Sequence, residues 1–366
     1  MKPTIHQLRR YAITHSLFRP TTLRAAVDRL GFVQADPIRA PARAHDLILR
    51  HRVKSYRAGD LERHYAALEL EEDFLYAYGF LTRALWLVVR RRNFTDLPEF
   101  EKKILATVRR HGITHPKHLA QLFGSERRTN NWGGYSRVTK LALEDLHERG
   151  LVRIAGRENG IRIYQAAIVP TERLSERERL RRLLLAIVNI LAPLSERTLR
   201  EAARPMRHLL ASYPQVLDSL VSSGELQKQV LDKVTYLLPE HERSQDETDR
   251  RVRFLAPFDP LVWDRRRFEH FWGWPYRFEA YVPQAKRLRG YYAMPLLWGD
   301  AVVGWANVSV VSGDLNVELG FVEGRPREKR FDLELDAEIG RMEAFLDLKN
   351  AADQPQLYTT KNSVVP

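Results

Sequence analysis

The residues that this sequence lacks already limit what the protein can be. Its 366 residues include no cysteine, which excludes disulfides, cysteine-bound zinc, iron–sulfur clusters and a thiol nucleophile. No stretch approaches the roughly 20 consecutive apolar residues of a membrane-spanning helix, and the N-terminus lacks the apolar segment of a signal peptide. We therefore expect a soluble, cytoplasmic protein that does not contact a membrane.

Acidic residues are too few to balance the basic ones. The sequence has 59 Lys and Arg against 46 Asp and Glu, a formal net charge of +13. Such an excess predicts an anionic partner, most commonly nucleic acid. The 12 histidines are scattered along the sequence, and there is no cysteine thiolate to bind a metal with them. We therefore predict neither a metal site nor a cofactor.

The clearest local pattern lies between residues 97 and 168. Three helices are expected and Gly150 ends the third, whose buried side is predicted to carry Val138, Leu141, Ala142 and Leu146, with Arg137 and Lys140 outward. A hairpin then follows. The expected helices are 100–110, 117–123 and 135–149, and the expected strands are 151–154 and 161–165. Three helices followed by a hairpin are typical of a winged helix, a variant of the helix-turn-helix.

A similar order recurs on both sides of this segment. Helices are expected at 175–191, 195–203 and 216–223, followed by a hairpin of 226–231 and 234–238. The N-terminal region carries two helices within 4–30, ended by Gly31, then an extended segment and a helix at 43–50, and is interpreted as a divergent copy. The sequence thus predicts three tandem winged-helix modules, at 1–95, 96–170 and 171–240.

The C-terminal part differs in composition and in its expected secondary structure. After a charged linker at 241–253, aromatic and β-branched residues alternate with turn residues. Strands are expected at 276–282, 290–297, 301–311 and 314–321, followed by a helix at 333–348. These elements predict a small antiparallel β barrel at 250–350 and an irregular tail at 351–366. The predicted fold class is therefore α+β, with three tandem winged-helix modules and a C-terminal antiparallel β-barrel domain.

The candidate reactive groups lie in a short segment after Gly31. Pro37 favours an extended conformation at Asp36, and in an extended segment Gln34 and Asp36 point to the same side. The simpler interpretation is a pair of surface polar residues at the end of a strand. Four arginines follow and are expected to keep Asp36 ionised; they fit either a salt-bridged face or phosphate contacts. They are Arg39, Arg43, Arg50 and Arg52.

Two further segments carry concentrated charge. Asp259 and Asp264 precede a run of three arginines, and could form a paired carboxylate site or serve as helix caps and salt-bridge partners, the interpretation that we favour. Lys286 and Arg287 stand close to Tyr291, a mixture of cations and aromatic rings that suits contact with a nucleic-acid backbone.

These residues together resemble the crosslink-repair DNA glycosylases of the YcaQ family, and the resemblance covers nearly the whole chain. It rests on four separated stretches in the family's order: 33–36, which fits the family's Gln-x-Asp motif, 132–153, 257–265 and 276–292. The family fold is three tandem winged helices and a C-terminal β barrel, arranged as a C that holds duplex DNA. The resemblance implies a partner, double-stranded DNA carrying alkylated bases or crosslinks, and we expect a nucleoid-associated monomer.

By the same resemblance, Gln34 and Asp36 are the catalytic pair of a monofunctional glycosylase that removes N7-alkylguanine and unhooks interstrand crosslinks. No lysine lies in the motif, so no Schiff-base step is expected. Whether the base is flipped from the stack stays open. The alternative is a winged-helix regulator without enzymatic activity. The residues expected to contact DNA are Arg39, Arg43, His45, Trp132, Arg137, Lys140, Arg265, Lys286, Arg287 and Tyr291.

Overall fold

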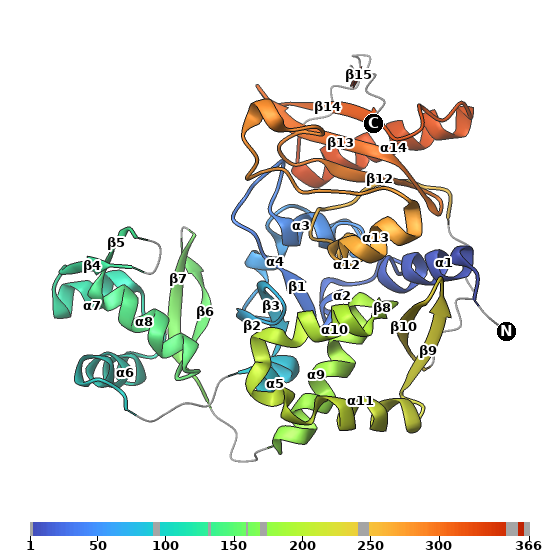
Figure 1. Ribbon diagram of the computed structural model, residues 1–366. Coiled ribbons are helices and arrows are strands. Elements are labelled where there is room, and N and C mark those ends of the chain that lie inside the picture. Colours follow the sequence, from blue (N-terminus) through green and yellow to red (C-terminus); the bar gives the residue numbers. More distant parts are fainter. Residues whose placement is uncertain are drawn as a thin grey trace.

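The chain folds into a main body and a smaller unit beside it. The computed structural model describes residues 3–90, 96–130, 133–158, 160–168, 174–240, 249–348 and 358–361. In Figure 1 residues 96–168 lie to one side of the main body, where the N-terminal helices and strands are placed between the C-terminal sheet and the helices of residues 176–222.

Helix capping residues position the first elements. Thr4 and Gln7 form a capping box at the start of α1 (Ile5–Ser16), and the Thr22 hydroxyl accepts a hydrogen bond from the Ala25 amide at the start of α2 (Leu23–Leu30). Gly31 adopts a left-handed conformation, with φ of 68°, which ends α2 as predicted. The chain then enters β1 (Phe32–Gln34), which carries the first residue of the candidate pair.

β1 is the edge strand of a three-stranded sheet with the order β1-β3-β2. The other elements of this region are α3 (Ala44–Leu49), α4 (Asp60–Arg63), β2 (Leu70–Phe74), β3 (Tyr78–Thr82) and α5 (Arg83–Val89). Gln34 stands opposite Gly79 in the antiparallel ladder. A Cβ atom at Gly79 would lie 2.4 Å from the Val33 carbonyl oxygen and 2.6 Å from the Phe32 ring, so β1 can approach β3 this closely only because position 79 is glycine.

Residues 96–168 have a core of their own. Their elements are α6 (Glu99–His111), α7 (Pro116–Phe123), β4 (Arg127–Thr129), β5 (Tyr135–Arg137), α8 (Val138–Glu148), β6 (Val152–Glu158) and β7 (Ile161–Ala166). Side chains from these elements, such as Ile104, Leu119 and Leu146, form a cluster separate from the rest of the protein. The expected order of three helices and a hairpin is present.

The third helix of this unit differs in detail from the prediction. α8 begins at Val138 and not at Tyr135, because residues 135–137 pair with residues 127–129 as a second small hairpin. Its fully buried residues are Thr139, Ala142, Leu143 and Leu146. Val138 and Leu141 are only partly buried, so the predicted buried face was wrong by about one residue along the helix.

The region after residue 174 also shows three helices followed by a hairpin. Its elements are α9 (Glu176–Leu191), β8 (Leu194–Ser195), α10 (Glu196–Ala203), the 3₁₀ helix η1 (Arg204–Ser212), α11 (Tyr213–Ser222), β9 (Leu226–Leu231) and β10 (Val234–Pro239). Its apolar side chains share one cluster with those of α1, α5, α12 (Pro260–Trp263) and α13 (Arg265–Trp272). The first and third regions and the start of the C-terminal part therefore form a single body.

The C-terminal sheet is an open half barrel. Its order is β11 (Val252–Phe254), β12 (Met294–Trp298), β13 (Ala301–Val311), β14 (Asp314–Phe321) and β15 (Tyr358–Lys361). The first four strands are antiparallel, whereas β15 runs parallel to β14. α14 (Lys329–Leu346) packs on this sheet through residues such as Phe331 and Met342.

Three predictions for this part were wrong. Residues 276–282 form no strand; the Tyr276 ring packs against Phe268 and Trp274, and the Phe278 ring packs against Phe258 and Tyr292. Residues 252–254, expected in the linker, form β11, and residues 358–361, expected to be irregular, form β15. Gln284–Lys286 is a short 3₁₀ helix, η2. Among the described residues, no helix is long and apolar enough to cross a membrane.

Candidate active site

The first residue of the candidate pair has an unpartnered polar atom. Gln34 is only 9% exposed at the end of β1, and its side-chain carbonyl oxygen has no hydrogen-bond partner among the described residues. Buried side-chain oxygens nearly always have a partner. An oxygen left without one costs about 1–3 kcal/mol, so its retention indicates a role other than stability.

Asp36 lies two residues beyond Gln34, where the strand has ended. Its Oδ1 accepts a hydrogen bond from the Ile38 amide at 2.9 Å, which fixes the carboxylate above Pro37 in an Asx turn. Partial burial raises the pKa of Asp36 above its ordinary value, and the Ile38 bond offsets this only in part. Loss of solvent and the Ile38 amide, and not the arginines, account for this shift, and an ionised Asp36 at neutral pH stays a prediction.

Three of the four nearby arginines are occupied by other carboxylates, and Arg43 is occupied in this way by Glu62. Arg52 is fully buried and binds both oxygens of Asp259, at 2.8 and 2.9 Å, while Arg50 binds the buried Glu338. Asp264 caps α13 by accepting from the Arg266 and Arg267 amides. A catalytic pair of Asp259 and Asp264 is therefore excluded, and the alternative of helix caps and salt bridges is confirmed.

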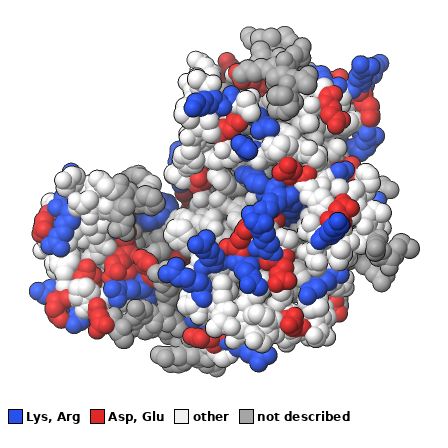
Figure 2. Space-filling model, in the orientation of Figure 1, with Lys and Arg blue, Asp and Glu red and all other residues white. Residues whose placement is uncertain are grey.

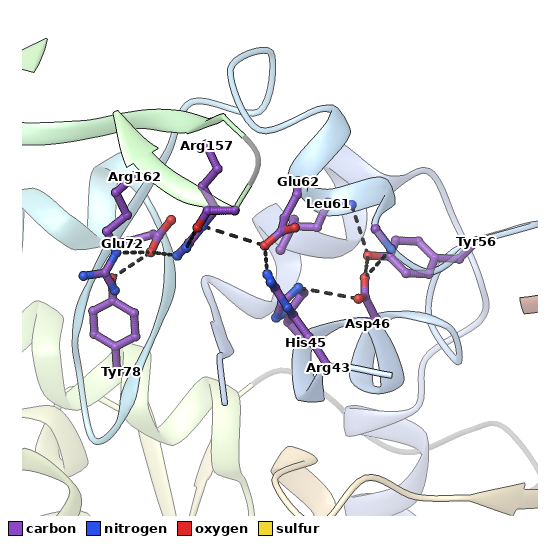
Figure 3. A network of polar contacts seen from close by, with 12 residues as sticks. Arg43, His45, Asp46, Tyr56, Leu61, Glu62, Glu72, Tyr78, Arg157 and Arg162 are labelled. Carbon is purple, nitrogen blue, oxygen red and sulfur yellow. Dashed lines mark hydrogen bonds and ion pairs between the residues drawn. The ribbon is translucent and has the colours of Figure 1, made fainter. Parts of the chain in front are cut away.

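Arg43 and His45 belong to a network of polar contacts between the main body and the β6–β7 hairpin (Figure 3). Arg43 binds Glu62, which also lies 3.7 Å from Arg157 of β6. Arg157 binds Glu72 of β2 at 2.6 Å. Glu71 is held in the same way by Arg153 of β6, at 2.8 Å. These ion pairs attach the second unit to the edge strand β2.

The structure contradicts the prediction that His45 contacts DNA. Its side chain is 1% exposed and packs edge-on against Phe80, with ring centroids 4.9 Å apart. Burial lowers the pKa of His45 to about 4, so the ring is neutral near pH 7 and offers no charge to a phosphate.

The remaining predicted DNA contacts lie in different settings. Arg39, Arg137 and Lys140 are exposed, the last two at the start of α8. Lys286 is exposed, and Arg287 lies over the exposed ring of Tyr291 at 5.0 Å. All five cations are exposed or partly exposed, although Lys140 lies 3.6 Å from Glu144 and Arg287 donates to the Val282 carbonyl. Trp132 lies outside the described residues.

Arg265 is a structural residue in this fold. Its guanidinium donates to the carbonyls of Val262 and Pro257, both at 2.8 Å, and lies over the Tyr276 ring at 4.5 Å. Its two terminal nitrogens are thus already used to hold the turn before α13, and the prediction of a DNA contact at Arg265 is not supported by this geometry.

Tyr292 is a residue of this region that the sequence did not single out. Its side chain is buried, and its hydroxyl has no hydrogen-bond partner among the described residues. Burial and the nearby Asp36 carboxylate raise the pKa of Tyr292 well above its ordinary value. Tyr292, Met294 and Leu296 belong to one apolar cluster, and the adjacent Ala293 and Leu297 belong to another. Tyr291, by contrast, is exposed.

The basic residues are not spread evenly over the surface. Figure 2 shows Lys and Arg side chains gathered across the middle of the main body, over the layer that contains α3 and β1 in Figure 1, with acidic residues prominent on the second unit. Such a distribution favours a polyanion as the ligand of the main body.

A mixed helix and strand body with a partly buried carboxylate and a basic face (Figure 2) favours a protein that acts on nucleic acid. A family model described as "DNA glycosylase AlkZ-like" matches residues 27–345, and the chain belongs to this family. The suspected family is confirmed, and the protein is a DNA-repair glycosylase, an enzyme that acts on N-glycosyl bonds in DNA. A solved structure, Streptomyces sahachiroi DNA glycosylase AlkZ, has the same fold, with a TM-score of 0.63 and 13% identity over 99% of this chain and 100% of that one.

Proposed function

We propose that this glycosylase hydrolyses the N-glycosidic bond of alkylated purines, N7-alkylguanine above all, and that it unhooks interstrand crosslinks of the same chemistry. Asp36 activates the attacking water and Gln34 orients it. The observation that supports this most is the unpartnered, buried side-chain oxygen of Gln34 beside a carboxylate with a raised pKa.

The chemistry needs no more than these two groups. An N7-alkylguanine is cationic, so it leaves with the electron pair of the C1′–N9 bond as a neutral base and requires no general acid. The water oxygen bonds to C1′ and its proton passes to Asp36. The carboxylate also stabilises the positive charge that develops on the sugar.

The raised pKa of Asp36 suits a general base. A carboxylate at its ordinary pKa is a weak base near neutral pH, and the most effective catalytic base has a pKa closer to the working pH. Partial burial moves Asp36 in this direction. Gln34 has no charge and can direct the water through its carbonyl oxygen.

The arrangement of the modules supports binding of a duplex by a single copy of the chain. Both the second and the third regions show three helices followed by a hairpin, the order of a winged helix. We assign Arg39, Arg137, Lys140, Lys286, Arg287 and Tyr291 to contacts with the DNA backbone. No lysine occurs between Gln34 and Pro37, so the reaction is hydrolysis without a Schiff-base step.

The test is release of base from duplexes that carry either N7-methylguanine or a nitrogen-mustard crosslink. The wild-type protein should release the alkylated base and separate the crosslinked strands, whereas Asp36→Asn should do neither. Asp28→Asn, an isosteric change of an exposed aspartate on α2, is the matched control and should behave as wild type. Equal release by wild type and Asp36→Asn would overturn the assignment.

A further inference from the structure

Tyr292 is held rigidly by its neighbours near Asp36. Its ring packs edge-on against Phe278 and Phe258, with centroid distances of 5.4 and 6.5 Å. The segment before it is fixed as well, because Glu279 accepts hydrogen bonds from the Arg289 and Gly290 amides at 2.8 and 3.2 Å. The hydroxyl of Tyr292 therefore has a defined position.

Three other buried tyrosine hydroxyls in this protein have partners. Tyr56 donates to Asp46 at 2.8 Å, Tyr65 to the Ile154 carbonyl at 3.2 Å and Tyr276 to the Ala293 carbonyl at 2.6 Å. Tyr292 is 3% exposed, yet its hydroxyl has no partner among the described residues. A buried phenol normally forms at least one hydrogen bond, so this hydroxyl is placed to meet something that binds.

The residues around Asp36 and Tyr292 belong to one packed layer. Ala35 and Ile38, which flank Asp36, pack against the same apolar cluster that contains Tyr292, and so do Phe258 and Phe278. The Asp36 carboxylate is close enough to help raise the pKa of Tyr292. The phenol therefore keeps its proton near neutral pH and is available as a donor.

We propose that Tyr292 is a positioning residue of the glycosylase reaction, whose hydroxyl donates a hydrogen bond to the water that Asp36 activates. This inference rests on the proposed function. It adds a third group, from the C-terminal sheet region, to a pair that the N-terminal region supplies.

The three groups match the hydrogen-bonding capacity of one water molecule. The water donates one proton to Asp36 and one to the side-chain carbonyl of Gln34, and accepts from Tyr292 through one lone pair. The second lone pair is left to attack C1′. Both unpartnered buried oxygens, that of Gln34 and that of Tyr292, thereby acquire partners, which is the arrangement that a built water site requires.

The experiment compares single-turnover base release and DNA affinity for wild type, Tyr292→Phe, Asp36→Asn and a control. Tyr292→Phe removes one oxygen and should slow base release about tenfold, as loss of one hydrogen bond does, with DNA affinity unchanged. Its melting temperature should not fall, because removing an unpartnered buried hydroxyl costs no stability. The control is Tyr213→Phe, in which a tyrosine of equal burial on α11, 3% exposed, loses its hydroxyl; its rate should stay at the wild-type value.

The outcomes separate this inference from the function on which it rests. If Asp36→Asn is inactive and Tyr292→Phe releases base at the wild-type rate, Tyr292 has no positioning role and the proposed function stands. If wild type and Asp36→Asn are equally active, both fail. If Tyr292→Phe melts earlier than wild type, the assay is repeated at a temperature where circular dichroism shows it fully folded. A wild-type rate there also overturns the inference.

Discussion

Two buried ion pairs join parts of this protein, whereas two buried oxygens at the candidate active site have no partner among the described residues. Arg52 and Asp259 join the N-terminal region to α12 with two hydrogen bonds, and both oxygens of Glu71 accept from Arg153 of the second unit. At the active site, Gln34 and Tyr292 each keep one buried oxygen without a partner among the described residues. In this comparison the paired groups hold parts of the fold together, and the unpartnered oxygens are those that we propose to meet the reacting water.

The difference is one of free energy as well as geometry. Removing the partner of a paired buried charge strongly destabilises the protein. An unpaired buried oxygen already destabilises the fold, so deleting it does not lower the stability of the protein. Mutations at the two kinds of site should therefore have opposite effects on stability and activity.

The largest effect, on stability, is expected at the ion pair of Arg52 and Asp259. Asp259→Asn keeps the shape and the cap of α12 but leaves the fully buried Arg52 without a counter-charge. We expect a loss of about 3–5 kcal/mol in the free energy of unfolding, measured by urea denaturation. Asp28→Asn, at an exposed position, should change it by less than about 0.5 kcal/mol. A similarly small change in Asp259→Asn would show that this pair does not hold the two regions together.

The next largest effect is on rate, at the active site. Asp36→Asn should slow base release by about a hundredfold or more, because one carboxylate supplies both the base and the charge beside the sugar. In contrast to Asp259→Asn, this variant should remain fully stable. A loss of stability equal to that of Asp259→Asn would place Asp36 among the structural carboxylates and break the comparison.

A smaller and local effect is expected where the second unit joins the main body. Glu71→Gln removes the charge that Arg153 and Arg83 bind, at 2.8 and 2.5 Å. We expect faster hydrogen exchange in the β6–β7 hairpin, corresponding to about 1–3 kcal/mol, while the core of α9 stays protected. Glu176→Gln, at an exposed position on α9, serves as the control. If exchange in the hairpin is unchanged, other contacts attach the second unit.

The pH dependence of stability should reveal how much the partly buried Asp36 carboxylate destabilises the folded protein. Because the folded protein raises the pKa of Asp36 from its ordinary 3.8, folding favours the protonated form. This contribution is fully present below pH 3.8 and is lost as the pH rises through the folded-state pKa. Asp36→Asn should therefore be at least as stable as wild type at pH 7, and its advantage should shrink toward pH 4. Urea denaturation at both pH values measures this; a variant that is less stable at pH 7 would contradict it.

The smallest effect concerns the surface of the second unit. Lys140→Glu reverses an exposed charge near the start of α8 and should reduce the slope of log affinity for duplex DNA against log salt by about 1 or slightly more. Lys103→Glu, an exposed position on α6, is the matched comparison and should have less effect. Equal slopes for Lys140→Glu and wild type would remove this face from the DNA contact.

The sequence predicted best what depends on neighbouring residues. The end of α2 at Gly31, the capping role of Asp264 and the hairpin of β9 and β10 all follow from local chemistry. It predicted poorly what depends on distant partners: residues 135–137 became a strand because residues 127–129 pair with them, and β15 formed on the edge of β14.

The same limit applied to the active site. Gln34 and Asp36 were identified by a motif, but the motif did not reveal that partial burial raises the pKa of Asp36 or that this carboxylate lies near Tyr292. His45 and Arg265 were chosen as cations, yet tertiary contacts bury the first and occupy the second. Local sequence reports which groups are present and not which of them the fold leaves free.

Gly79 shows how far the catalytic requirement extends beyond the reacting groups. It carries no functional atom, yet any side chain at this position would collide with the Val33 carbonyl and push β1 outward. In a library of random variants selected for resistance to alkylating agents, position 79 should thus tolerate no replacement, as if it were catalytic. Mutational sensitivity alone would therefore class Gly79 with the active-site residues. Activity and stability measurements on purified variants would be needed to show that its role is structural.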